Sequence, residues 1–134
     1  MKVGDTVVTG NILGRKWCCT VDEVFSYGEE GDVPLVADWD NTGQQRIGVF
    51  RRGQWWLDMN GDHIWDATHD LEFSYGIPGD VPVIGDWTHS GQTRIGVFRQ
   101  SQWWLDMNGD HVWDALRDTL VYFGVSSDIP VVGQ

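Results

Sequence analysis

The sequence is poor in features that whole classes of protein require. It has 9 basic residues against 20 acidic ones and a net charge of −11, so it lacks the positive surface of a nucleic-acid-binding protein. No apolar run approaches the roughly 18–20 residues of a membrane-spanning helix. The N-terminal sequence MKVGDTVVTGN has no apolar stretch that would serve as a secretory signal. We therefore expect neither nucleic-acid binding nor membrane insertion.

Cysteine and glutamate are also scarce. The two cysteines, Cys18 and Cys19, are adjacent, and neighbouring cysteines rarely bond to each other because the geometry is strained, so they define no disulfide framework. Sixteen of the 20 acidic residues are aspartates, which favour turns and cation sites over helices. No sustained 3.6-residue apolar period is present, so we predict essentially no long helix.

The chain is instead rich in repetition. Residues 25–72 and 73–120 align without a gap at an offset of 48 residues, and 32 of the 48 positions are identical. A third copy begins near the C-terminus, and the N-terminal stretch resembles the end of a degenerate copy, in which Asp22 matches Asp70. We interpret residues 1–134 as a single repeat array, made of a degenerate half unit (1–24), two whole units (25–72 and 73–120) and a partial unit (121–134).

Each unit has the pattern of four short β-strands. The first contains DVPLVADW, RIGVFR, QWWLDM and HDLEFSYG, with turn signals at Asn41-Thr42-Gly43 and Asn60-Gly61-Asp62. Four strands in a repeat of about 40–50 residues are typical of a β-propeller blade. The alternatives are a β-solenoid, whose repeats are usually shorter, and a β-sandwich, which gives no reason for sequence repetition. We predict an all-β fold of four-stranded antiparallel propeller blades, about three per chain.

The segments GDVPLVADWDNTGQQRIGVFR and WLDMNGDHIWD resemble the FG-GAP/VCBS-type repeats of bacterial surface and secreted proteins, which are related to the blades of integrin α-chain propellers. The resemblance covers residues 25–134 well and residues 17–24 weakly. It implies a β-propeller, often with calcium in interstrand loops, and usually a role in adhesion or ligand binding. It also implies an extracellular or cell-surface location, and it does not imply one particular ligand.

The first acidic loop of each unit departs from the calcium pattern of that family. Asp38 opens a loop with oxygen-bearing residues at positions 1, 3 and 5 and Gly43 at position 6, but position 9 is Arg46 where the family has an acid. The second unit repeats the departure with Asp86 and Arg94. Because a guanidinium cannot ligate a cation, we predict metal-free loops in which Arg46 pairs with Asp38, and Arg94 with Asp86, in bidentate fashion.

The second acidic loop keeps the D-x-N-x-D-x-x-x-D spacing of calcium loops. Its one departure is histidine at position 6 (His63 and His111), where glycine is usual because that residue often takes a positive φ. The alternative is a plain hairpin turn in which the aspartates cap backbone amides. We predict a calcium site in each unit, formed by Asp58, Asn60, Asp62, the Ile64 carbonyl and Asp66, and by Asp106, Asn108, Asp110, the Val112 carbonyl and Asp114.

Two adjacent tryptophan pairs recur at the repeat spacing, Trp55-Trp56 and Trp103-Trp104. Successive residues of a strand face opposite sides, so the two members of a pair cannot point the same way. One member is expected to pack between sheets, and the other is available as a platform on which a sugar stacks. All four are therefore candidate ligand-binding residues.

Three units are too few to close a propeller, which needs about four to eight blades. Two chains give about six, and the strand at residues 128–132 of one chain is suited to complete the half unit at residues 1–24 of a partner. We predict a homodimer of this kind. The alternatives are another oligomer and a fragment of a longer propeller.

The sequence has no Ser/His/Asp, Cys/His or HExxH arrangement and no glycine-rich phosphate-binding loop, so we predict that the protein is not an enzyme. The leading hypothesis is a binding or adhesion module for carbohydrate or a protein surface, with calcium as a structural cofactor. The alternative is a self-assembling architectural propeller fragment with no small ligand.

Overall fold

The computed structural model describes residues 2–3, 8–9, 20–21 and 24–132. Most of the half unit predicted at residues 1–24, including Cys18 and Cys19, lies outside the described residues. All regular structure in the described part is β-strand, with no helix, which confirms the predicted all-β class. Among these residues there is accordingly no helix of the length and hydropathy needed to cross a membrane.

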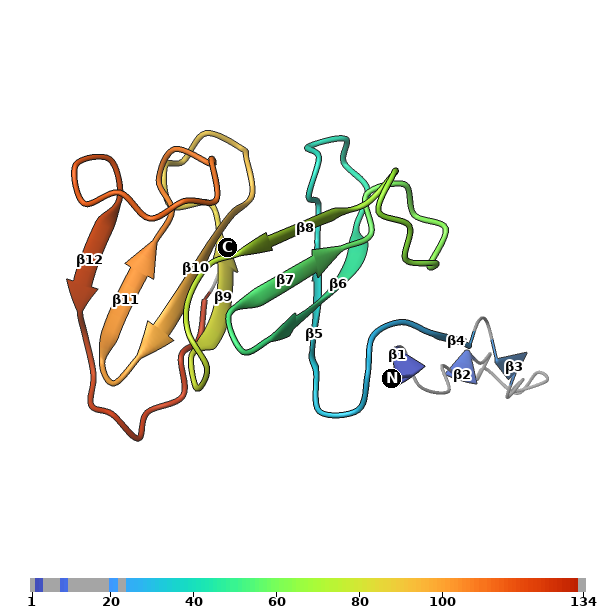
Figure 1. Cartoon of the computed structure of the whole chain (residues 1–134), viewed down its shortest axis with the longest axis horizontal. Coiled ribbons are helices and arrows are strands. Elements are labelled where there is room, and N and C mark those ends of the chain that lie inside the picture. Colours follow the sequence, from blue (N-terminus) through green and yellow to red (C-terminus); the bar gives the residue numbers. More distant parts are fainter. Residues whose placement is uncertain (1, 4–7, 10–19, 22–23, 133–134) are drawn as a thin grey trace, which may run out of the picture.

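Two four-stranded antiparallel sheets lie side by side and make up the body of the molecule (Figure 1). Within each sheet the strands are hydrogen-bonded in chain order, so the chain runs up and down through the sheet. Corresponding strands of the two sheets begin 48 residues apart. Sheet 1 consists of β5 (Val33–Ala37), β6 (Arg46–Arg51), β7 (Gln54–Leu57) and β8 (Leu71–Ser74), and sheet 2 of β9 (Val81–Gly85), β10 (Arg94–Arg99), β11 (Gln102–Leu105) and β12 (Thr119–Tyr122).

The second strand of each sheet is buried along most of its length. Strand β6 pairs with β5 and β7, and its β-branched and aromatic side chains fit the pleated surface. A two-residue turn connects β6 to β7, and both turn residues, Arg52 and Gly53, have positive φ (51° and 88°), as expected for a tight hairpin. The equivalent turn of sheet 2 uses Gln100 and Ser101 at φ 48° and 70°.

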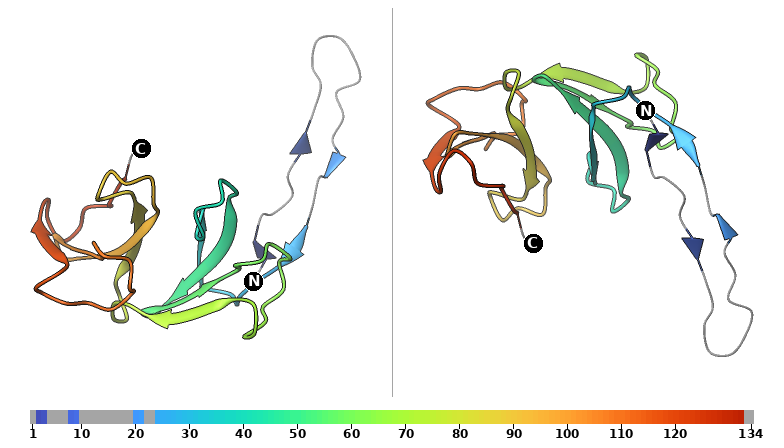
Figure 2. Two further views of the ribbon diagram at one scale, coloured as in Figure 1. Left: turned by 90° about the horizontal axis from the view of Figure 1, so that it is seen from above. Right: turned by 90° about the horizontal axis from the view of Figure 1, so that it is seen from below.

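Four shorter strands lie N-terminal to sheet 1. Strand β1 (Lys2–Val3) pairs antiparallel with β4 (Phe25–Ser26), and β2 (Val8–Thr9) pairs antiparallel with β3 (Thr20–Val21). Figure 2 places β2 and β3 beyond sheet 1, on the side away from sheet 2.

The same turn leads into the first strand of each unit. The Asp32 carboxylate accepts a hydrogen bond from the Glu29 amide at 2.8 Å, and Asp80 accepts one from the Ile77 amide at 2.8 Å. In the partial third unit the Val125 amide donates to Asp128 at the same distance, 2.8 Å. The described C-terminal segment therefore begins the local structure of a further unit.

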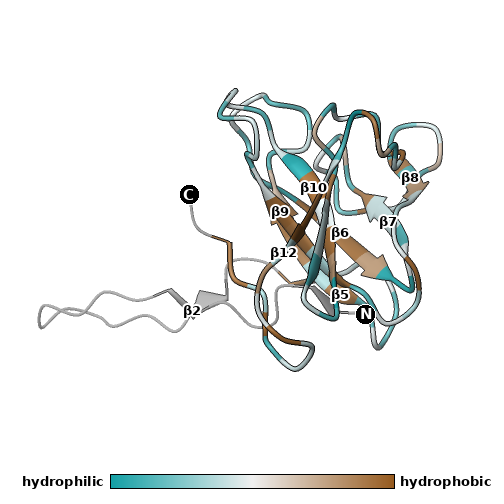
Figure 3. Cartoon of the chain, turned by 90° about the vertical axis from the view of Figure 1, so that its left-hand side faces the viewer, coloured by the Kyte–Doolittle hydropathy of each residue, from teal (hydrophilic) through white to brown (hydrophobic). Residues whose placement is uncertain are grey.

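The main core lies between the two sheets. We call face 1 the side of a sheet that carries the first tryptophan of its pair, and face 2 the opposite side. Face 1 of sheet 1, with Trp55 and Leu57, packs against face 2 of sheet 2, with Ile95 and Val97. A smaller cluster on face 2 of sheet 1 is centred on Val49. In Figure 3 hydrophobic residues are prominent in β6, β9 and β12, and hydrophilic residues are prominent in many of the connecting loops.

Candidate functional site

Three aspartates come together at the same place in each sheet. Within each cluster, one ligand oxygen of every carboxylate lies within 4.8 Å of the others. Such oxygens are the hard ligands that calcium prefers, so each cluster can hold a metal ion. The first cluster consists of Asp58, Asp62 and Asp70, and the second of Asp106, Asp110 and Asp118.

The innermost member of each cluster follows directly on the third strand of its sheet. Asp58 and Asp106 are both fully buried. The Gly61 and His63 amides each donate a hydrogen bond to the Asp58 carboxylate at 2.9 Å, which wraps the loop around this side chain. Asp58 was among the predicted ligands. The loop is closed around it by hydrogen bonds from the loop's own backbone amides.

The equivalent carboxylate in sheet 2 is electrostatically disfavoured in its charged form. Burial raises the pKa of the Asp106 carboxyl; the amides of His111 and Gly109 counteract this, and the charge of Asp118 adds to it. A cation at this position would offset the accumulated negative charge.

The exposed half of the loop is ordered by short-range hydrogen bonds. The Asp62 amide donates to Asn60 Oδ1 at 3.2 Å, and the Ile64 amide donates to Asp62 Oδ1 at 3.0 Å. The second loop repeats these bonds at the same distances. They are the contacts that the hairpin-turn interpretation requires, and they also hold the Asp62 carboxylate beside Asp58 and Asp70.

The third carboxylate of the cluster differs from the predicted one. Asp66 begins a tight turn, and its carboxylate is hydrogen-bonded within that turn. It accepts from the Thr68 amide at 2.8 Å and contacts His69 Nδ1 at 2.8 Å. Asp70, four residues later, accepts from the Met59 and Asp66 amides at 2.9 and 2.8 Å and faces the cluster instead. Sheet 2 repeats this arrangement, with Asp118 in the cluster and Asp114 bonded to the Leu116 amide.

Sequence reasoning missed Asp70 and Asp118 because they lie beyond the nine-residue motif. The turn between Asp66 and Asp70 folds the later aspartate back, and such a return is not encoded in linear spacing. One signal was present, since the same aspartate recurs at the repeat offset as Asp118 and, in the degenerate copy, as Asp22.

Histidine at loop position 6 has a packing role. His63 and His111 adopt left-handed φ of 63° and 62°, the conformation that usually favours glycine. Each imidazole stacks on a phenylalanine from an earlier strand, Phe25 of β4 at 3.9 Å and Phe73 of β8 at 4.1 Å between ring centroids. Burial lowers the pKa of His111, which favours the neutral ring. Histidine in place of glycine thus connects each loop to the phenylalanine on which it stacks.

The predicted ion pair within the first acidic loop of unit 1 is wrong. Arg46 was expected to pair with Asp38, but both Asp38 oxygens accept backbone amides of their own loop, from Thr42 at 3.0 Å and Gly43 at 2.7 Å. The guanidinium lies 3.6 Å from Asp40 and donates to the Met59 carbonyl of the other acidic loop.

The second unit shows the same departure from the expected pairing of Arg94 with Asp86. The Asp86 oxygens accept the amides of Ser90 at 3.0 Å and Gly91 at 2.7 Å. Arg94 donates to the Met107 carbonyl at 3.3 Å. In both units the arginine therefore links the two acidic loops, and the expected partners Asp38 and Asp86 accept backbone amides of their own loops instead.

Each unit does contain a bidentate arginine–aspartate pair, but it joins a different arginine to a different aspartate. Arg51 donates to Asp32 at 2.5 and 2.8 Å, and Arg99 donates to Asp80 at 2.7 and 2.9 Å. Burial opposes ionisation of Asp32, but the hydrogen bonds from Arg51 and from a backbone amide outweigh it and lower its pKa. The sequence contained a signal for these pairs, because Asp and Arg recur 19 residues apart in both units.

In sheet 1 the two tryptophans of the pair point to opposite faces, as the alternation of side chains along a strand predicts. Trp55 is fully buried on face 1, where its Nε1 donates to the Tyr75 carbonyl at 2.9 Å, and this removes it from the candidate ligand-binding residues. Trp56 points to face 2 and is partly exposed, with the Arg51 guanidinium 4.5 Å from its ring.

In sheet 2 both members of the pair are partly exposed. Trp103 Nε1 donates to the Phe123 carbonyl at 3.2 Å, and Trp104 packs edge-on against Trp113 with 4.8 Å between ring centroids. Trp56, Trp103 and Trp104 thus remain accessible in part, each in a different setting.

No protein-family model, no curated protein and no solved structure matches this chain.

Proposed function

We propose that the chain is a non-enzymatic binding or adhesion module, built from β-propeller-type blades and stabilised by calcium. The observation that carries this proposal is the three-aspartate cluster, which recurs at the same position of both sheets. Two up-and-down sheets of four strands, packed face 1 against face 2, support the blade arrangement. The resemblance to surface and secreted repeat proteins supports an extracellular or cell-surface location.

The donor set suits calcium as a structural cofactor. Calcium takes six to eight oxygen ligands. Three carboxylates per cluster supply the charge, and Asn60 or Asn108, backbone carbonyls and water are available for the remainder. A bound cation would neutralise the buried aspartate and join the start of the loop, at Asp58, to its end, at Asp70.

Calorimetric titration of calcium into EDTA-treated protein tests this proposal. We expect two equivalent sites and, at a free calcium concentration of about 100 times Kd, a stabilisation of about 2.7 kcal/mol for each occupied site. The double variant Asp70→Ala/Asp118→Ala is expected to abolish both the heat and the stabilisation. The absence of both from the native protein would leave the hairpin-turn interpretation.

A matched control separates the two candidate third ligands. Asp66→Ala/Asp114→Ala removes carboxylates that are bonded within their own turns, so calcium binding should persist. Loss of binding in this control, with retention in Asp70→Ala/Asp118→Ala, would reverse the assignment of the third ligand.

A second candidate function is self-assembly into a closed ring, and one observation favours it. Apolar side chains at the C-terminal end are strongly exposed, with Phe123 at 75%, Ile129 at 85% and Val131 at 83%. Face 1 of sheet 2 has the same residue pattern as face 1 of sheet 1, which packs against a following sheet. We propose that a second copy supplies that following sheet, so that two chains form a homodimer of about six blades.

Sedimentation equilibrium measures this directly. A dimer is expected at micromolar concentration, and Trp103→Asp should convert it to monomer by placing a charge on the joining face. A species of 15.2 kDa at all concentrations would rule out the assembly.

A further inference from the structure

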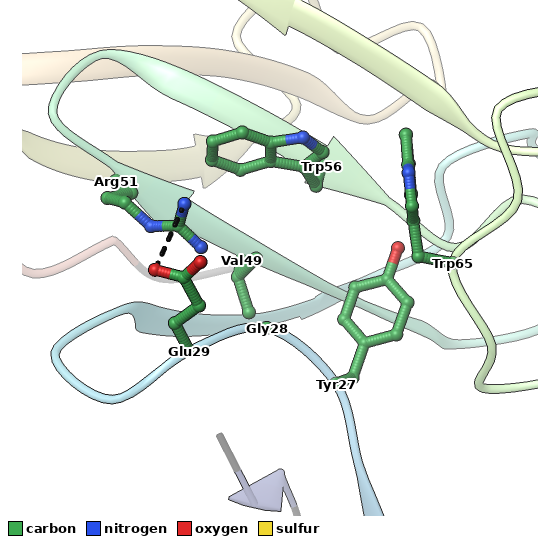
Figure 4. Close-up of a pocket in the computed structure, with 7 residues that line it drawn as sticks. All are labelled: Tyr27, Gly28, Glu29, Val49, Arg51, Trp56 and Trp65. Carbon is green, nitrogen blue, oxygen red and sulfur yellow. Dashed lines mark ion pairs between the residues drawn. The ribbon is translucent and has the colours of Figure 1, made fainter.

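A cavity of about 280 Å³ lies on face 2 of sheet 1 (Figure 4). The residues 48 positions later surround a second cavity, of about 150 Å³. The two sets match at every position but one, where Ile77 replaces Glu29. The first cavity is bounded mainly by Tyr27, Glu29, Val49, Arg51, Trp56 and Trp65.

A buried hydroxyl without a partner distinguishes the first cavity. Tyr27 is only 4% exposed, and its hydroxyl has no hydrogen-bond partner among the residues that the structure describes. Figure 4 shows this hydroxyl directed between Trp56 and Trp65. The equivalent hydroxyl of Tyr75 donates to the Trp104 carbonyl at 3.4 Å. Buried polar groups are normally hydrogen-bonded, so the Tyr27 hydroxyl is available to bond an oxygen from outside the chain.

The Tyr27 hydroxyl is a donor at neutral pH. The ordinary pKa of a tyrosine hydroxyl is about 10, and burial raises the pKa of Tyr27 above that value. It therefore stays protonated and offers both a proton and lone pairs to a ligand hydroxyl.

The rim of the cavity offers a fixed donor, Arg51, beside an exposed acceptor, Glu29. Two hydrogen bonds to the buried Asp32 hold the Arg51 guanidinium, and Glu29 lies 3.4 Å from its outer nitrogen. The Glu29 side chain is 71% exposed, so most of its hydrogen-bonding capacity faces solvent. A carboxylate next to a guanidinium matches two adjacent hydroxyl groups, one donating and one accepting.

The walls of the cavity are aromatic. Trp56 and Trp65 come from β7 and from the loop that follows it, and both are partly exposed. Aromatic faces pack against the apolar C–H face of a ligand while polar groups at the edge fix its orientation. The volume is at the lower end of the roughly 300–1,000 Å³ of small-molecule sites, which suits a single ring.

We propose that this cavity binds one neutral pyranose sugar, with its C–H face on Trp65 beside the edge of Trp56 and its hydroxyls on Glu29, Arg51 and Tyr27. This inference rests on the proposed binding function and specifies its ligand class and site. An alkylammonium ligand fits less well because Arg51 already lies 4.5 Å from the Trp56 ring. A purely apolar ligand would leave the Tyr27 hydroxyl unpaired.

The second cavity is not a second copy of the site. Its volume is about half as large, Ile77 offers no acceptor, and Trp104 and Trp113 contact each other at 4.8 Å. The Tyr75 hydroxyl already has its own partner. One sugar is therefore expected per chain.

Titration with the neutral methyl glycosides of glucose, galactose, mannose, fucose and N-acetylglucosamine, followed by NMR of the tryptophan indole N–H groups, tests the proposal. We expect saturable shifts of the Trp56 and Trp65 signals with at least one glycoside and a stoichiometry of one. Tyr27→Phe and Glu29→Ile should each weaken binding at least tenfold, whereas the matched control Tyr75→Phe should leave it unchanged.

The variants are first checked for folding by thermal unfolding and for calcium binding, which none of them is expected to alter. No shift with any of the glycosides would overturn the sugar site. Binding that survives both Tyr27→Phe and Glu29→Ile would overturn it as well, while leaving the broader carbohydrate-binding function intact.

Discussion

The two units of this chain are nearly the same in sequence and differ in surroundings. Trp55 and Trp103 occupy the same register of the same kind of strand, yet Trp55 is fully buried and Trp103 is partly exposed. Sheet 2 covers face 1 of sheet 1, whereas no third sheet covers face 1 of sheet 2 among the described residues. The comparison teaches that burial in a repeat array is a property of the neighbour as much as of the unit.

The same comparison applies to the cavities on face 2. Equivalent residues enclose an open space in the first unit and a small, internally satisfied one in the second. The linings differ in one side chain, Glu29 against Ile77, and Trp104 contacts Trp113 in the second unit. In addition, face 2 of sheet 2 packs against sheet 1, whereas no four-stranded sheet covers face 2 of sheet 1 among the described residues. Near-identical units can therefore differ in what they bind.

The largest expected effect tests the difference in burial directly. Trp55→Ala should lower the free energy of unfolding by about 4 kcal/mol, because it leaves a large cavity between the sheets. Trp103→Ala should lower it by only about 1–2 kcal/mol, since its side chain already contacts water. Urea unfolding at low protein concentration measures both. Equal losses would mean that a second copy covers Trp103 in solution.

The next prediction concerns the bidentate arginine–aspartate pair, which both units contain. Asp32→Asn and Asp80→Asn each break a bidentate ion pair with a buried carboxylate, and each should cost about 3 kcal/mol. Asp40→Asn is the control, because its contact with Arg46 is longer, at 3.6 Å, and should contribute less than about 1 kcal/mol. Losses below 1 kcal/mol for Asp32 and Asp80 would contradict a structural role for the pairs.

The hairpin turns of the two sheets differ in sequence, and substitutions in them should change stability by a smaller amount. Ser101 holds φ 70° without being glycine, so Ser101→Gly should stabilise the protein by about 0.5 kcal/mol or leave it unchanged. Gly53→Ser should destabilise it by about 2 kcal/mol, because a Cβ there would lie 2.5 Å from the Gly76 carbonyl oxygen and would also strain a φ of 88°. Thermal unfolding of the two variants checks the opposite signs. A neutral Gly53→Ser would mean that the connection to sheet 2 is displaced at low cost.

The smallest effect is a pH dependence in the first unit. The folded pKa of Asp32 is lowered, so the stability that its ionised form contributes is fully present above the unfolded value of about 3.9 and is lost as pH falls through the folded value. The difference in unfolding free energy between the native protein and Asp32→Asn should therefore be constant near neutrality and shrink below about pH 4. A difference that shrinks already between pH 8 and 6 would point to another titrating group.

The sequence predicted the all-β class and two of the three carboxylates in each aspartate cluster. The four-strand pattern of each unit was legible because β-branched and aromatic residues alternate between turn signals, as in RIGVFR and the QWWL that follows it. Asp58 and Asp62 were found because calcium loops space their ligands within one short segment. Asp70 was missed because a turn returns it to the cluster from outside that segment.

The arginine pairings show a second limit of sequence reasoning. Arg46 was assigned to Asp38 because the two share a loop, but backbone amides of the same loop already fill the Asp38 oxygens. Arg51 reaches Asp32 across the pairing of β5 with β6, 19 residues away. Proximity along the chain favoured the wrong partner because strand pairing decides which charges meet.

The sequence by itself determined the repeat, the positions of the strands and turns, and the concentration of charge in aspartate loops. These depend on local backbone preference and on side-chain alternation, which each segment carries with it. Only the tertiary structure decided which tryptophan is buried, which aspartate completes each cluster and which of two matching cavities stays open. Trp55 is buried because a second sheet follows its unit, whereas no sheet follows the unit of Trp103 among the described residues. The cavity of the second unit lies on face 2 of sheet 2, which packs against sheet 1, while no preceding four-stranded sheet covers face 2 of sheet 1 among the described residues. The third aspartate is folded back to its cluster by the same turn in both units.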